Sequence, residues 1–304
     1  MKGFAVAASL VLLAGTAAPA PAASSSLRAA APDVPCQVLP ADNVWNMDVS
    51  SLPVHPKSKT WKRSAHAGST LLHPDFGGPY GIPYDVVDDT HPTVAVDFTY
   101  ADESDDEPYP FGPDIHVEGG SDRHALMVNA DTCTLYELYD AHWHAGNPDA
   151  GSGAVFDLGS DELRPAGWTS ADAAGLPILP GLVRYDDVLR GAIKHAIRFT
   201  APATCNGYIY PARHKAGSGS CATRPPMGLR VRLKSTVDIS KYGSQARIVL
   251  TALKRYGMIL ADNGSPWYIT GAPSSKWNDD ELHTLGGIKG SDFEVVDTTG
   301  FVNG

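Results

Sequence analysis

The sequence predicts an α+β fold built mainly on antiparallel β-sheet, with a sandwich as one arrangement, and two or three helices in the C-terminal half. Strand-like segments dominate the first two-thirds of the chain, helical periodicity comes later, and the βαβ alternation of a doubly wound sheet is missing. Thirty Gly and twenty-four Pro among 304 residues, spread without a period, indicate many turns between short elements.

The first half of the chain predicts short strands. Frequent prolines between residues 39 and 92 break helices and leave strands such as 84–87. Residues 94–100 alternate apolar and polar side chains, which predicts a strand with one buried face. An antiparallel hairpin is predicted at 125–129 and 135–139, around the turn 130–132. Further short strands fit 155–158, 208–210 and 229–233.

Helical spacing begins at Asp186, an N-cap residue for a helix whose apolar face continues to Ile197. A second helix is predicted through 248–256, with Gly257 as its left-handed C-terminal residue. After it, strands 258–261 and 267–270 around the turn 262–265 predict a hairpin. Asn278 with Glu281 indicates the start of a short helix, and 293–296 a last strand.

The N-terminus has the features of a secretory signal peptide. A charged start at Lys2 precedes an apolar run over 4–13, and small residues lead to a cleavage pattern at Ala22. No later stretch has about 18 uncharged apolar residues, so we expect a secreted protein with no membrane anchor. The predicted organisation is a signal peptide at 1–22, a linker at 23–35 and a single globular domain at 36–304.

The four cysteines are an even number in an exported chain and have no CxxC spacing, so two disulfides are expected. Three pairings are conceivable. We favour Cys205–Cys221, which closes a short loop containing glycines, and by elimination Cys36–Cys133.

Charge and motifs exclude several classes of function. With 24 Lys and Arg against 34 Asp and Glu, the formal net charge is −10, which argues against a protein that tracks nucleic acid or an anionic membrane. The chain contains no GxSxG, P-loop, HExxH, GxGxxG or EF-hand motif. Esterases of the α/β-hydrolase type, nucleotide-binding enzymes and zincin proteases are therefore disfavoured.

Glu137 and Asp172 are the predicted catalytic carboxyl pair. On a strand, Glu137 shares a face with Leu135 and Tyr139, and this apolar setting would raise its pKa and suit a general acid of glycoside hydrolysis. Asp172 lies in a loop of small residues that could line a cleft, with Trp143 or Trp168 at its wall. The alternatives are a solvated Glu137 and an Asp172 that complements a capped helical turn.

Two Arg-His pairs, Arg123-His124 and Arg213-His214, suggest a second kind of chemistry. Arg213 and His214 with a tyrosine, Tyr208 or Tyr210, would suit a lyase that abstracts a proton beside a carboxylate. The alternative is that the arginines simply pair with acids. The residues expected to bind substrate are Trp143, Trp168, Tyr210, Arg123 and His124.

Metal binding is a weaker possibility in this sequence. His142 and His144 could hold a metal with Glu137 or His124, although a surface pair around a sugar-stacking Trp143 fits better. The acidic run 102–107 could hold a structural Ca²⁺ or simply form a solvated turn. We expect no other cofactor.

The chain resembles a group of secreted bacterial proteins of unassigned function. The resemblance is carried by the segments 42–46, 80–87, 167–188, 252–264 and 290–297. The resemblance covers nearly the whole mature chain and implies a single domain without implying an activity. From the carboxyl pair Glu137 and Asp172, and not from the resemblance, we expect a secreted, monomeric glycoside hydrolase acting on a polysaccharide or cell-wall glycan. The alternatives are a polysaccharide lyase and a non-catalytic glycan-binding protein, whose exposed aromatics would line no catalytic cleft.

Overall fold

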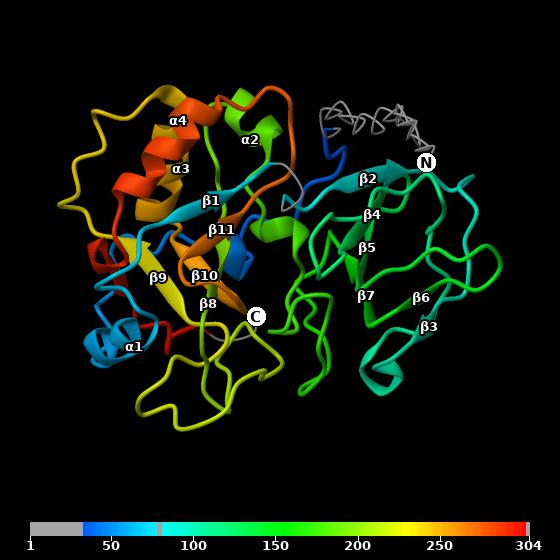
Figure 1. Ribbon diagram of the computed structural model, residues 1–304, viewed down its shortest axis with the longest axis horizontal. Helices are drawn as coiled ribbons and strands as arrows, with labels where there is room; N and C mark the ends of the chain where they lie inside the picture. Colours follow the sequence, from blue (N-terminus) through cyan, green and yellow to red (C-terminus); the bar gives the residue numbers. More distant parts are fainter. Residues whose placement is uncertain (1–32, 78–80, 302–304) are drawn as a thin grey trace, which may run out of the picture.

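The structure is a computed structural model that describes residues 33–77 and 81–301. The predicted signal peptide and most of the predicted linker lie outside the described residues. The fold is α+β and sandwich-like, as predicted, with its strands in curled sheets that mix parallel and antiparallel pairs. Two lobes lie side by side in Figure 1, one around each of the two larger sheets.

The large lobe is built on a six-stranded sheet and most of the helices. In spatial order, its strands are β1 (His73–Asp75), β11 (Tyr268–Thr270), β8 (Ile197–Ala201), β10 (Met258–Asn263), β9 (Arg230–Leu233) and β12 (Phe293–Val295). The α-helices of the chain are α1 (Ser58–Ser64), α2 (Tyr185–Leu189), α3 (Ser244–Arg255) and α4 (Asp279–His283). Helix α3 packs on β9 and against α4, and α1 packs beside β12.

The small lobe contains the other two sheets. Its four-stranded sheet has the order β2 (Tyr84–Val87), β4 (Ala125–Asn129), β5 (Thr134–Tyr139) and β7 (Ser152–Asp157), and its two-stranded sheet pairs β3 (Asp97–Phe98) with β6 (Asp149–Ala150). Single 3₁₀ turns lie at Val44–Asn46, Ala101–Glu103, Leu179–Gly181, Thr284–Gly287 and Gly290–Asp292.

Both faces of the four-stranded sheet are covered by apolar side chains. Along β4, Leu126 and Val128 belong to the larger hydrophobic cluster, which also contains the core of the large lobe, whereas Ala125 and Met127 belong to a smaller cluster on the other face. A strand alternates its side chains between two faces, so every residue of β4 and β5 that points into either cluster is withdrawn from water. Because both faces of the sheet are covered, Glu137 on β5 is buried.

Several predicted elements are confirmed. The hairpin is β4 and β5 paired antiparallel, the strand at 84–87 is β2, and β7, β9 and β12 lie at the strands predicted at 155–158, 229–233 and 293–296. The strand predicted at 208–210 is wrong, because only a single bridge between Tyr208 and Met227 forms there. Helix α3 is followed by Gly257 at φ 68°, and Asn278 caps α4 by accepting a hydrogen bond from the Glu281 N–H at 3.1 Å. The strand predicted at 94–100 is shorter, with only β3 in a sheet.

Two predicted elements are wrong because distant parts of the chain compete for the same residues. The helix from Asp186 to Ile197 ends as α2 at Leu189; Gly191 takes a φ of 80°, and Ile197 already begins β8. Strands β10 and β11 form no hairpin, because β8 lies between them, parallel to β10 and antiparallel to β11.

Helix α1 was not predicted, because the prolines around it masked a short helical segment.

Both predicted disulfides are confirmed. Cys36 pairs with Cys133 at a Cα–Cα distance of 5.7 Å, and Cys205 pairs with Cys221 at 5.0 Å. Such bridges fit a protein exported to an oxidising compartment. Within the described ranges, no helix is long and apolar enough to cross a membrane.

Candidate functional site

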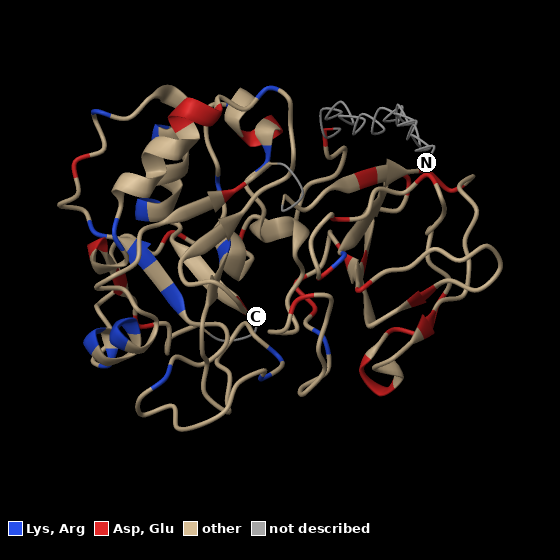
Figure 2. Cartoon of the chain, in the orientation of Figure 1, with Lys and Arg blue, Asp and Glu red and all other residues tan. Residues whose placement is uncertain are grey.

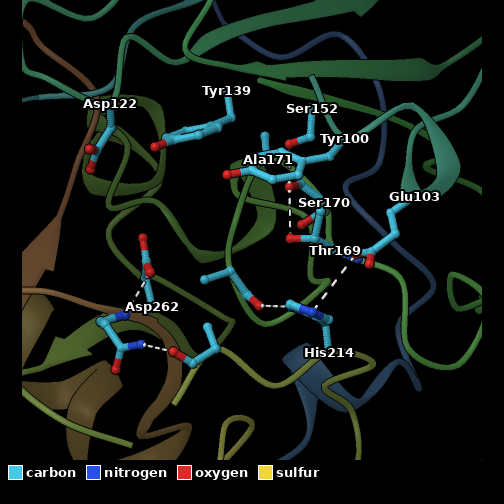
Figure 3. A pocket seen from close by; sticks show the side chains of 13 residues that line it. Tyr100, Glu103, Asp122, Tyr139, Ser152, Thr169, Ser170, Ala171, His214 and Asp262 are labelled. Carbon is cyan, nitrogen blue, oxygen red and sulfur yellow. Dashed lines mark hydrogen bonds and ion pairs between the residues drawn. The ribbon is translucent and has the colours of Figure 1, made fainter. Parts of the chain in front are cut away.

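Two adjoining hollows form a groove between the lobes. The first, of about 430 Å³, is lined by side chains from β5, β7, the 169–173 loop, the loop carrying His214 and the end of β10 (Figure 3). The second, of about 530 Å³, is lined by β1, β11, β8 and the segment 118–124. Because Asp122, Asp262 and Asn263 line both hollows, we treat them as one feature, the interlobe groove.

The floor of the second hollow is a polar face of the six-stranded sheet. In the pairing of β1 with β11, His73 lies opposite Tyr268 and Asp75 lies opposite Thr270. Because side chains alternate between the two faces of a strand, both pairs lie on the same face of the sheet. Arg198 of β8 lines the same hollow. The His73 and Tyr268 rings stack with their centroids 4.0 Å apart, which offers a flat wall in the groove.

A buried ion pair lies beneath this floor. The guanidinium of Arg198 donates from Nε and Nη2 to the two carboxylate oxygens of Asp172 at 2.9 and 2.8 Å, and from Nη1 to the Thr270 hydroxyl at 2.7 Å. Arg198 is 3% exposed and Asp172 0%. Their charges compensate each other, so Arg198 has little left to offer an anionic ligand.

Asp262, at the end of β10, is the groove carboxyl best suited to hold a proton. Burial and the negative charge of Asp172 raise the pKa of Asp262 to about 7, against the opposing charges of Arg198 and His124. Its Oδ1 accepts a hydrogen bond from the Asn263 N–H at 2.6 Å. No other described residue forms a hydrogen bond or ion pair with this carboxyl, so it is available to a ligand in the groove.

Asp122 faces Asp262 from the other lobe. The two carboxyl groups point toward one another across the first hollow, beside the Tyr139 ring (Figure 3). Burial and the nearby carboxylates, Asp122 first and Asp262 among them, raise the pKa of Tyr139. Asp122 is exposed, and among the described residues its carboxyl accepts a hydrogen bond only from the Ser121 hydroxyl, at 3.2 Å.

Asp75 is a further available carboxyl in the second hollow. Burial and the charge of Glu118 raise the pKa of Asp75 to about 6. Within residues 33–77 and 81–301, the side chain of Asp75 forms no hydrogen bond or ion pair.

His124 and Glu118 form a buried pair at the edge of the second hollow. Nδ1 of His124 lies 2.6 Å from Glu118 Oε2, and Nε2 lies 3.2 Å from the Ala171 carbonyl oxygen. Burial lowers the pKa of His124, but the hydrogen bond and charge of Glu118 outweigh burial and raise it. The predicted ligand-binding residue His124 therefore does line the groove, with both ring nitrogens already engaged.

His214 lies at the other end of the groove. It lines the first hollow with Tyr100 and Tyr139, whereas the predicted partners Tyr208 and Tyr210 do not line this hollow. Its Nδ1 is 2.9 Å from the Ala173 carbonyl oxygen, and its Nε2 is 3.8 Å from Glu103 Oε2. Arg213 points elsewhere and donates from Nε to the Arg164 carbonyl oxygen at 2.7 Å.

The prediction that Glu137 and Asp172 face each other across an open groove is wrong. Both are 0% exposed. Glu137 lies under the larger cluster and accepts hydrogen bonds from the N–H groups of Ile178 and Leu179 at 2.9 Å. Burial does raise the pKa of Glu137, to about 7, as the strand argument predicted. A raised pKa without access to a substrate makes it a structural carboxyl.

The other predicted binding residues also lie outside the groove. Trp143 packs edge-on against Phe111, and the Arg164 guanidinium lies 5.6 Å from the centre of the Trp168 ring. Arg123 donates from Nε to the Ala141 carbonyl oxygen at 3.0 Å. Tyr210 is half-buried against the larger cluster. The groove offers instead the aromatic rings of Tyr100, which is 54% exposed, of Tyr139 and of the stacked His73–Tyr268 pair.

No group of three or more His, Cys, Asp or Glu side chains in the described part of the chain is arranged to hold a metal. His142 and His144 stack on each other and pair with Asp140 at 2.9 Å and Asp149 at 3.2 Å, respectively. In the acidic run 102–107, Asp105 pairs with Arg164 and Glu103 accepts the Thr169 N–H. The structural Ca²⁺ there stays a prediction.

Asp75, Glu118, Asp122 and Asp262 were missed as site residues. Asp262 was assigned to a turn because it begins the Asp-Asn-Gly sequence after an apolar run. A carboxyl that directly follows four buried strand residues was a signal that could have been used. Asp75 and Glu118 carried no comparable local signal: the pairing of β1 with β11 brings Asp75 to the groove, and Glu118 lies in the 118–124 segment that lines it.

No protein-family model, curated protein or solved structure matches this chain, so the resemblance to secreted bacterial proteins stays a sequence-based expectation.

Proposed function

We propose that this is a secreted glycoside hydrolase whose active site is the interlobe groove, with Asp262 as general acid and Asp122 as its partner carboxylate. One observation carries the proposal. Two carboxyl groups from opposite lobes point toward one another across an open hollow, and burial and the neighbouring charge of Asp172 raise the pKa of one of them, Asp262. Unequal environments of two groove carboxyls are what acid and base roles at one pH require.

The chemistry follows from the two environments. Asp262 holds a proton near neutral pH and can donate it to the glycosidic oxygen of a bound sugar chain. Asp122 is exposed on the other side of the hollow, so its carboxylate can activate water or attack the sugar carbon. The stacked His73–Tyr268 pair and the exposed Tyr100 are flat surfaces on which sugar rings can pack.

The charge of the groove favours a hydrolase over a uronate lyase. Five carboxyl groups line it, those of Asp75, Glu103, Glu118, Asp122 and Asp262, whereas its one arginine, Arg198, is committed to Asp172. A lyase needs a cation to neutralise the substrate's carboxylate before a proton is removed. Neutral glycans therefore suit this groove better than polyuronates.

A polysaccharide panel tests the proposal directly. We expect the mature protein to release reducing ends from a neutral polysaccharide, without the absorbance of unsaturated uronates. Unsaturated products from a polyuronate would instead favour a lyase that uses His214 and Tyr139. Binding of a glycan without any cleavage would indicate a binding protein.

The pH dependence of kcat/KM should follow Asp262. The carboxyl must be protonated to act, and its raised pKa lies at about 7. Above that pH, activity should fall about tenfold per pH unit, as loss of a single required proton predicts. Rates measured across this range on a substrate with no titratable group check the expectation. A profile that stays flat to about pH 9 would contradict the assignment of Asp262.

A further inference from the structure

A separate hollow of about 670 Å³ lies on the large lobe and shares no lining residue with the interlobe groove. Lys59, Lys62 and Arg63 line it from α1, and Lys234 lines it from the residue after β9. We call these four residues and the space between them the basic hollow. Figure 2 shows the Lys and Arg of α1 on the large lobe.

The cations of the basic hollow are not neutralised by the protein. None of the four forms an ion pair with a described residue. Lys62 and Lys234 donate from Nζ to main-chain carbonyl oxygens of Phe293 and Ser291 at 2.5 and 2.8 Å. Such contacts hold the ammonium groups in place while leaving their charge uncompensated.

The carboxylates nearby do not change this balance. Glu294 lines the hollow, but its Oε1 lies 2.9 Å from the guanidinium of Arg232, which already compensates its charge. Burial and the charge of Lys234 lower the pKa of Lys62, against the opposing charges of Glu294 and Asp292. Uncompensated cations held together in a chain of net charge −10 form a local field that attracts anions.

We propose that the basic hollow binds the phosphate groups of an extracellular phosphodiester polymer. Lys59 stands three and four residues before Lys62 and Arg63, so the three side chains share one face of α1. Three of the four cations are lysines, which act on phosphate as point charges, whereas planar carboxylates are recognised best by paired arginine forks. The site shares no lining residue with the interlobe groove and would hold the protein on an anionic surface.

Binding to soluble poly(glycerol phosphate) tests the site. We expect the wild-type protein to bind, with an affinity that falls as salt rises, because polyanion binding releases counterions. The double variant Lys59→Glu/Arg63→Glu reverses two exposed charges and should weaken binding at least about tenfold. The matched control is Lys194→Glu/Lys276→Glu, which makes the same charge change at exposed positions outside the hollow. The control should bind as the wild type does.

The proposal would be overturned by no binding of the wild type at low salt, or by equal binding of the Lys59→Glu/Arg63→Glu variant. An equal loss in the control would also overturn it, because it would show an effect of net charge alone. Polygalacturonate, a carboxylate polymer, should bind more weakly than poly(glycerol phosphate); equal affinity would overturn the assignment to phosphate. Glycosidase activity on a small soluble substrate should be unchanged in both variants, which separates this site from the interlobe groove.

Discussion

Asp262→Asn is expected to lower turnover by about a hundredfold to ten-thousandfold, which is the usual contribution of a general acid. Asparagine has nearly the same shape as aspartic acid but cannot donate the acidic proton. Because Asp262 holds a proton near neutral pH, the neutral amide should leave the fold intact. Steady-state rates on the substrate found with the polysaccharide panel, beside a thermal unfolding curve, measure both effects.

Glu137→Gln is the matched control for this experiment. Burial raises the pKa of Glu137 to about 7, as it does for Asp262, but Glu137 is 0% exposed and hydrogen-bonded to main-chain N–H groups. The folded Glu137→Gln variant should keep the wild-type rate. If Glu137→Gln lost activity while Asp262→Asn kept it, the carboxyl pair predicted from the sequence would be right and the groove assignment wrong.

Arg198→Met should lower the free energy of unfolding by about 3–5 kcal/mol, since it leaves a buried carboxylate without its cation. The Arg198 guanidinium makes two hydrogen bonds to Asp172, and Asp172 is 0% exposed. Methionine keeps much of the side-chain volume, so the loss reports the charge rather than a cavity. Denaturant unfolding of the wild type and the variant gives the difference directly.

A surface ion pair provides the comparison. Arg255 lies 2.9 Å from Asp48, with both side chains largely exposed, so Arg255→Met should cost less than about 1 kcal/mol. The double variant Arg198→Met/Asp172→Leu removes both members of the buried pair. It should recover most of the free energy of unfolding that Arg198→Met loses, because no unpaired charge stays buried. An Arg198→Met variant as stable as Arg255→Met would show that Asp172 is compensated by other groups.

The elements that could be predicted are those whose turn, apolar face or capping residue lies within the element or directly beside it. The β4–β5 hairpin has its turn within the segment, α3 has its own apolar face and Gly257, and α4 has its own cap. The helix predicted from Asp186 failed because apolar residues at helical spacing also suit a core-facing loop that leads into a strand. The hairpin around 262–265 failed because β8, from some 60 residues earlier, pairs with both strands.

The candidate site was predictable only in part. His124 and His214 do line the groove, as polar residues singled out in Arg-His pairs. Asp75 and Asp262 were not found, because one lies in a proline-rich stretch and the other in a turn sequence. Nothing near either residue in the chain indicates that they line one hollow.

The sequence by itself determined the properties that depend on covalent or neighbouring residues: the α+β class, the two disulfides, the β4–β5 hairpin, the C-terminal end of α3 and the start of α4. Only the tertiary structure decided which carboxyl groups meet the solvent. Glu137 sits on a strand whose two faces are both covered, and Asp172 is sealed beneath the groove by Arg198. The physical reason is that burial and charge compensation are set by elements far apart in the chain, so a local pattern can predict a raised pKa without predicting access.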